Sequence, residues 1–159
     1  MVVPLTVKQI VIKLKIMKTN LVYVLCFAFI TVTTSCRAQL MQNLNDAHKI
    51  ADNKNQFIGK PLKYLLREIK PDIKMVIPGE GNNYKPSSFS FLFITKKQYE
   101  EYSTKKATPL TIKVMVKENF KWDWKERSAQ EKKEFLWTKA DDKKYGDLTI
   151  VYINVYGSN

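Results

Sequence analysis

The chain has 159 residues, of which 45% are hydrophobic and 12% aromatic, and its 27 Lys and Arg against 15 Asp and Glu give a formal net charge of +12. This composition excludes a disordered chain, and five glycines and six prolines exclude a collagen-like or linker-dominated one. The length suffices for one compact domain with a core of modest size.

The first feature along the chain is an uncharged apolar run, LVYVLCFAFITV at residues 21–32, which follows Lys13, Lys15 and Lys18. Twelve helical residues reach about 18 Å, well short of the roughly 30 Å apolar core of a bilayer. A basic segment before a short apolar run is typical of a signal peptide, so we predict one over residues 1–35. A permanent transmembrane anchor is the alternative.

Small polar residues follow the run and lead to Cys36. The stretch TTSCRAQ resembles the relaxed lipobox of lipoprotein signals in Bacteroidota-type bacteria, and the resemblance covers residues 17–39. It implies a lipid on Cys36 and a place on the periplasmic face of the outer membrane. Cleavage after Ala38, which would give a secreted protein, is the alternative, because small residues at 36 and 38 fit the A-x-A pattern. A compact signal also begins at Met17, so residues 1–16 are either translated or an upstream start-site artefact.

The only cysteines are Cys26, inside the apolar run, and Cys36. No disulfide is therefore expected within the domain that follows the signal. Removal of residues 1–35 removes four lysines, so 23 basic residues against 15 acidic ones remain and the excess of positive charge survives processing. We predict a polar tether over residues 36–45 and a single domain over residues 46–159.

The order of helical and strand patterns predicts an α+β fold, with N-terminal helices packed on an antiparallel sheet of about four strands. Apolar residues at helical spacing predict a helix over residues 44–55 and a second one that starts at Pro61 and extends to Ile69. Alternating apolar residues predict strands, in a meander, at 73–77, 88–95, 110–116 and 148–156.

Two capping boxes lie between the last two predicted strands. Ser128 precedes Glu131 and Thr138 precedes Asp141, each at the spacing that satisfies free backbone N–H groups at a helix start. They predict two short helices. The intervening segment EFLWTK, residues 134–139, is too short for its period to be read, and a strand there is the alternative.

The most suggestive candidate site is the stretch FKWDWKER at residues 120–127, in which aromatic and basic side chains alternate. Two indoles on one strand face can stack on a flat ligand while nearby cations hold an anion. We therefore predict a ligand platform, whose members are Trp122, Trp124, Lys121, Lys125 and Arg127. The alternative is that both indoles close the edge of the core and the lysines are solvated.

No motif predicts a cofactor or a metal ion. His48 is the only histidine, and no Cys, Asp or Glu stands at a spacing that would complete a zinc site with it. Adjacent carboxylates such as Glu100 and Glu101 diverge by about 100° on a helix, so we interpret them as solvated surface residues.

Function is inferred here from location and from the absence of a catalytic motif. We expect a small exported envelope protein, anchored by a lipid, with a non-catalytic binding or structural role. The alternative is a small secreted enzyme acting on anionic glycan, with Asp123 or Glu126 as the acid. The expected partners are an envelope protein, an anionic glycan or a lipid headgroup, and export argues against nucleic acid despite the positive charge.

Overall fold

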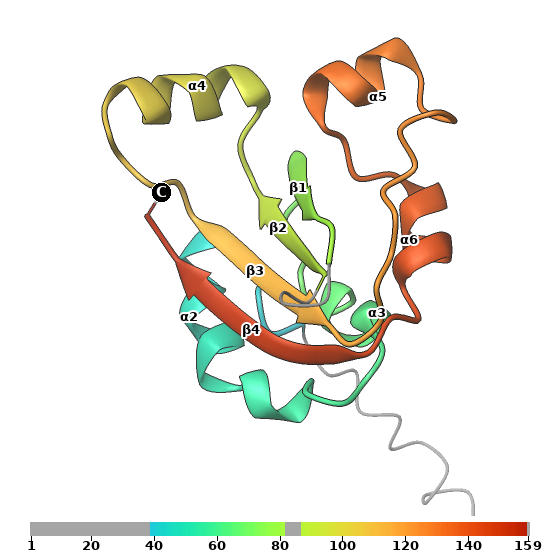
Figure 1. Ribbon diagram of the computed structural model, residues 1–159. Helices are drawn as coiled ribbons and strands as arrows, with labels where there is room; N and C mark the ends of the chain where they lie inside the picture. The colour runs from blue at the N-terminus through green and yellow to red at the C-terminus, as the bar shows by residue number, and fades with distance from the viewer. Residues whose placement is uncertain (1–38, 82–86, 159) are drawn as a thin grey trace, which may run out of the picture. The chain divides into compact units, whose positions relative to one another are not determined.

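The computed structural model describes residues 39–81 and 87–158 (Figure 1), all of which belong to one compact unit, Ala38–Asn159. The predicted signal peptide, Cys36 and Met17 lie outside the described residues. In the part of the chain that is described, no helix has the length and apolar character needed to cross a membrane.

A four-stranded antiparallel sheet forms the centre of the unit. Its strands are β1 (Met75–Gly79), β2 (Ser88–Leu92), β3 (Thr111–Val116) and β4 (Ile150–Tyr156), and they lie side by side in chain order. Antiparallel neighbours in sequence order make a meander, and this sheet confirms the predicted α+β class.

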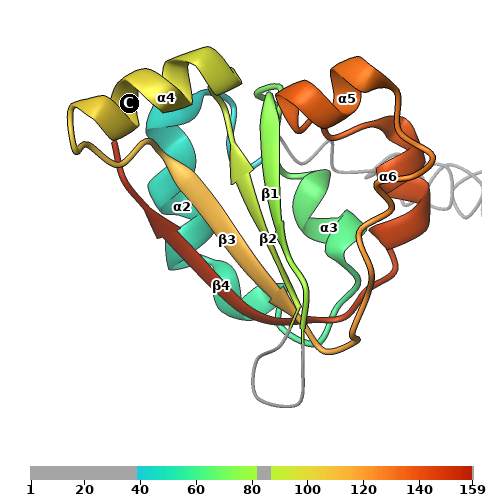
Figure 2. The ribbon, with the colours of Figure 1, turned by 45° about the horizontal axis from the view of Figure 1, so that its top comes forward.

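Helical segments precede the sheet and also connect its strands. Before the sheet come η1 (Leu44–Asp46), α2 (Ala47–Asp52), η2 (Lys54–Gln56) and α3 (Leu62–Leu66); α4 (Lys96–Thr104) joins β2 to β3, and α5 (Ala129–Glu134) and α6 (Lys139–Tyr145) join β3 to β4. Figure 2 shows α2 and α3 behind the sheet, with α6 beside it and α4 across the end of β2 and β3.

One face of the sheet is buried against these helices. In the two central strands, alternate residues Phe89, Phe91, Ile112 and Val114 are fully buried, as their period of two requires. They join Ile50, Leu62 and Leu65 from α2 and α3 in a single hydrophobic core. The buried apolar residues of the described chain run from Met41 to Ile153, within the compact unit Ala38–Asn159.

Aromatic rings form the half of this core that lies toward α6. The Phe89 ring stacks on Phe120 with 4.4 Å between centroids, and Trp137 meets Phe91 edge-on at 5.1 Å. Trp122 stacks on Tyr145 of α6 with centroids 5.2 Å apart. Side-chain packing therefore helps to fix the segment that connects β3 to α5.

The N-terminal boundary of the fold differs from the prediction. Met41 is fully buried, and its N–H donates to the Glu68 carbonyl at 2.9 Å while its own carbonyl accepts from Lys70 N–H at 2.9 Å. Because Gln39 onward packs on the segment after α3, the predicted tether over residues 36–45 is too long. The segment contains the apolar residues Leu40, Met41 and Leu44, which pack in or against the core, while the pairing itself uses backbone groups.

The capping boxes behave as predicted. Ser128 and Thr138 each accept a hydrogen bond from the backbone three residues on, and α5 and α6 begin directly after them. The alternative strand over residues 134–139 does not form; Phe135 ends α5 in a left-handed conformation, and its carbonyl accepts a single hydrogen bond, from Val76 N–H of β1 at 2.8 Å.

Glu118 lies just after β3 and links this strand to Thr149, the residue before β4. Its carboxylate accepts hydrogen bonds from Thr149 N–H at 2.8 Å and from Thr149 Oγ1 at 2.7 Å. Burial alone would raise the pKa of Glu118, but these two hydrogen bonds hold that pKa below its ordinary value.

We expect this carboxylate to give the protein an acid-sensitive contribution to stability. A folded-state pKa below the unfolded one means that the contribution is complete above the unfolded pKa and is lost as the pH falls through the folded one. The Glu118→Gln variant should therefore show a smaller drop in its urea midpoint between pH 6 and pH 3 than the wild type. Equal drops in both proteins would contradict the assignment.

The end of β4 requires glycine at position 157. Gly157 has φ +85°, and a Cβ on it would overlap the Pro109 carbonyl oxygen. Gly59 has a similar φ, +78°, with open space around the same position, which makes it a matched control.

We expect Gly157→Ala to lower the free energy of unfolding by about 2–3 kcal/mol, since both backbone strain and steric overlap act on it. Gly59→Ala meets strain alone and should lower it by about 1 kcal/mol. Chemical denaturation of both variants measures the difference, and equal losses would show that the overlap relaxes without cost.

Candidate functional site

The second face of the sheet has no helical layer over it, as Figure 2 shows. The strand register places alternate residues of all four strands on this side. We call this surface the open face; its exposed and half-buried members are Ile77, Gly79, Ser88, Ser90, Lys113, Met115, Tyr152, Asn154 and Tyr156. Tyr152 and Tyr156 are 44% and 38% exposed, so two aromatic side chains of this face are in solvent.

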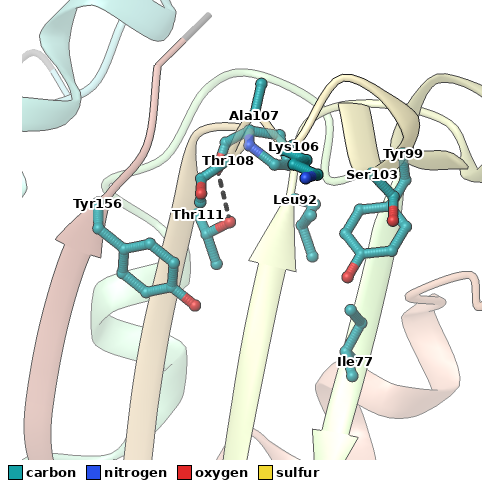
Figure 3. A pocket seen from close by; sticks show the side chains of 10 residues that line it. Ile77, Leu92, Tyr99, Ser103, Lys106, Ala107, Thr108, Thr111 and Tyr156 are labelled. Atoms are coloured by element: carbon teal, nitrogen blue, oxygen red, sulfur yellow. Dashed lines mark hydrogen bonds between the residues drawn. The ribbon is translucent and has the colours of Figure 1, made fainter. Parts of the chain in front are cut away.

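A hollow of about 280 Å³ lies at one end of the open face, beneath α4 and the loop that follows it. Figure 3 shows Tyr156 and Tyr99 on its two sides, with Leu92 and Thr111 between them. Its apolar floor comes from strands and its polar rim from α4 and the loop; the rim includes Ser103, Lys106 and Thr108.

Local sequence explains how α4 and its loop come to stand over the strands. Thr95 accepts a hydrogen bond from Gln98 N–H, and the Gln98 side chain accepts from Thr95 N–H, so a reciprocal capping box starts α4 at Lys96. After the helix, Lys106 takes a left-handed conformation with φ 53°, which turns the chain back toward β3. The buried Thr111 Oγ1 then donates to the Pro109 carbonyl at 2.9 Å and holds the loop against the sheet.

The charge of this region is positive. No Asp or Glu lines the hollow as the structure describes it, whereas Lys106 lines it and Lys113 lies on the adjoining open face. Two tyrosine hydroxyls and one serine hydroxyl supply hydrogen-bond donors and acceptors. This arrangement is suited to hold a ligand with an apolar or flat body and a negatively charged group; it offers no base or nucleophile oriented by a partner.

The five members of the predicted ligand platform differ in burial, and two of them have buried contacts. Trp122 is only 5% exposed, and the Arg127 guanidinium lies 4.0 Å above its ring. Arg127 also pairs with the buried Asp141 and donates to the Leu136 carbonyl at 2.8 Å. Trp122 and Arg127 therefore have buried structural contacts. For Trp122 this agrees with the alternative interpretation, in which the indoles close the edge of the core.

The remaining three members have exposed side chains. Trp124 is 38% exposed and meets Phe135 edge-on with centroids 5.4 Å apart, while Lys121 and Lys125 extend into solvent. The two indoles meet at 77°, with centroids 6.4 Å apart, so they do not present one flat surface. A ligand contact at this place remains a prediction for Trp124 and the two lysines.

The carboxylates named as candidate acids lie beside a smaller hollow of about 140 Å³, which Asp123, Glu126, Glu131 and Asp141 line together with Arg127 and Lys144. Asp123 pairs with Lys144, and this hydrogen bond is the main cause that holds the pKa of Asp123 below its ordinary value. A general acid must carry a proton near neutral pH, so a lowered pKa is unfavourable for that role.

Glu131 and Asp141 are likewise committed to helix starts. Backbone and side-chain hydrogen bonds with Ser128 lower the pKa of Glu131, and Asp141 accepts from Thr138 N–H at 2.7 Å. His48 is exposed, and its Nδ1 lies 2.8 Å from the Asn45 carbonyl oxygen. Within the described ranges, no three His, Cys, Asp or Glu side chains gather in a way that could hold a metal ion.

The residues of the open face were not identified as a site from sequence. The alternation of β4 does place Tyr152 and Tyr156 on one side, and that signal predicted the strand. It did not reveal that the helices would cover only the other side. No family model matches this chain, and no curated protein and no solved structure matches it either.

The Arg127 contacts give a stability prediction. In the Asp141→Asn variant the Arg127 guanidinium stays buried but loses the carboxylate that neutralises it. The free energy of unfolding should therefore fall by about 3 kcal/mol or more. Asp123→Asn removes a carboxylate from an exposed lysine pair and should leave the unfolding midpoint close to that of the wild type. A midpoint for Asp141→Asn equal to that of Asp123→Asn would show that Arg127 is not held by its charge.

Proposed function

We propose that this protein is a small, exported, lipid-anchored envelope protein that binds another envelope component through its open face, without catalysis. Export and the lipid on Cys36 are proposed from the apolar run at residues 21–32 and the TTSCRAQ stretch. The binding role is proposed from the open face itself.

A single observation carries the binding role: the open face exposes Tyr152 and Tyr156, and Tyr156 lines a hollow whose rim holds hydroxyls and Lys106. Tyrosines supply a large contact area with little loss of side-chain entropy, and they are enriched at binding interfaces. A solvated sheet face with no such role more often carries short polar or charged side chains.

Charge defines the class of partner that we favour. The lining of the hollow contains a lysine and no carboxylate, so the best complement is an envelope protein that presents an acidic side chain or a chain terminus beside apolar residues. The lysine also draws in the partner over a distance of about a Debye length.

We expect site-specific cross-linking from the open face to capture the binding partner. A photoreactive amino acid at Tyr152 or Tyr156, in cells that export the full chain, should give a discrete adduct that mass spectrometry identifies as an envelope protein. The same amino acid at Lys54, an exposed residue of η2 in the helical layer, is the matched control. Adducts of equal yield from all three positions, or from Lys54 alone, would reject the open face as the binding surface.

The anchor is tested separately by the mass of the N-terminal peptide from membrane-extracted protein. A peptide that begins at Cys36 with added acyl mass is expected, and an unmodified peptide that begins at Gln39 would contradict the anchor.

A further inference from the structure

A groove runs between α3 and α6, on a different part of the molecule from the open face. Two adjoining hollows of about 400 and 460 Å³ form it, and both are lined by Leu66, Lys139 and Asp142. The two helices lie side by side in both ribbon views, and Lys63 N–H donates to the Gly146 carbonyl at 2.8 Å (Figures 1 and 2). We call this surface the α3–α6 groove.

The groove carries more positive than negative charge. Six cationic side chains line it, namely Lys63, Arg67, Lys70, Lys74, Lys139 and Lys143, against the carboxylates of Asp72 and Asp142. Lys63 pairs with Asp147 and Lys74 with Asp72, at 2.5 and 3.2 Å. The other four cations make no ion pair with any described residue, and all four are exposed.

Apolar side chains lie among these cations. Leu66, Ile73, Leu136 and Trp137 are half-buried in the groove, and the indole N–H of Trp137 donates to Asp142 at 2.6 Å. A surface that mixes lysines with an indole and aliphatic groups fits the interface of a bilayer, where charged headgroups lie above hydrocarbon.

The N-terminal end of the described chain is fixed to one end of this groove. The Gln39 side chain donates to the Arg67 carbonyl at 2.8 Å, and Leu40 N–H donates to the Glu68 carboxylate at 3.0 Å. Met41 also forms a parallel bridge with Ile69, which lines the groove. The point where the chain enters the fold therefore lies beside Arg67 and Lys70.

The chain between this point and Cys36 is short. Cys36 stands three residues before Gln39, and three residues span at most about 11 Å even when fully extended. A lipid on Cys36 would therefore hold the bilayer surface close to the end of the α3–α6 groove.

We propose that the α3–α6 groove docks on anionic phospholipid headgroups of the bilayer that holds the lipid on Cys36. This inference rests on the proposed lipid anchor for its geometry and on the unpaired cations for its chemistry. Arg67, Lys70, Lys139 and Lys143 contact phosphate groups, while Trp137 lies at the depth of the headgroups.

The first test uses the compact unit Ala38–Asn159, which contains the hydrophobic core of the described residues and carries no lipid. Its binding to vesicles of phosphatidylcholine alone is compared with binding to vesicles that contain one-third phosphatidylglycerol, by sedimentation. We expect binding only to the anionic vesicles and a roughly 100-fold loss in K70Q/K139Q/K143Q, since each lysine at an anionic surface contributes about fivefold.

The matched control is K54Q/K97Q/K105Q, which removes the same charge from exposed lysines outside the groove. It should bind within about threefold of the wild type, because it changes only the long-range attraction. Equal losses in the two triple variants would overturn the proposal, and so would equal binding to neutral and anionic vesicles. Binding to a soluble anionic polysaccharide in preference to anionic vesicles would also overturn it, in favour of a glycan as occupant.

A second readout uses the full chain in isolated envelope membranes. Reductive methylation should label Lys54 and Lys105 fully and leave Lys139 and Lys143 protected until detergent is added. Full labelling of all four before detergent would contradict the docking. The mass of the N-terminal peptide from the same sample reports the anchor independently, so a missing lipid together with retained vesicle binding would reject the anchor and leave the basic surface standing.

Discussion

Burial of only one face of the four-stranded sheet is the constraint on which the rest of this structure depends. The side chains of β2 and β3 alternate, so four buried residues point to one side: Phe89, Phe91, Ile112 and Val114. The helices before the sheet and the aromatic segment after β3 both pack on that side. These helices and this segment do not cover the opposite side of the sheet, so its tyrosines stay exposed to solvent. Only one end of that side is covered, by α4 and its loop.

The sequence predicted most of the elements, because their signals are local. Alternation placed the four strands to within a few residues, and the capping boxes at Ser128 and Thr138 placed α5 and α6. The same reasoning was less successful at the N-terminus, where Met41 is buried through backbone pairing with the segment after α3. Pairing between backbone groups so far apart in the chain leaves no local pattern in the sequence, and the predicted tether was too long for that reason.

The candidate site was harder to predict than the fold because no local pattern encodes it. The alternating aromatic and basic residues at 120–127 predicted a ligand platform, yet Trp122 is buried in the core and Arg127 covers its ring. The hollow instead unites Tyr99 from α4, Thr111 from β3 and Tyr156 from β4, which are up to 57 positions apart in the chain. Only the tertiary arrangement of α4 over the strands brings them together.

The two proposed surfaces are compatible because they lie on different parts of the molecule. In Figure 2 α3 lies behind the sheet and α6 beside it, so neither helix of the α3–α6 groove covers the open face. A bilayer in contact with the groove would then leave the open face accessible to a partner protein. Docking through several cations would also limit the rotation of the domain about its short N-terminal connection, which reduces the entropy that a partner must remove on binding. In these two proposals positive charge has a different role on each surface: in the groove it would orient the domain, and in the hollow it would select the partner.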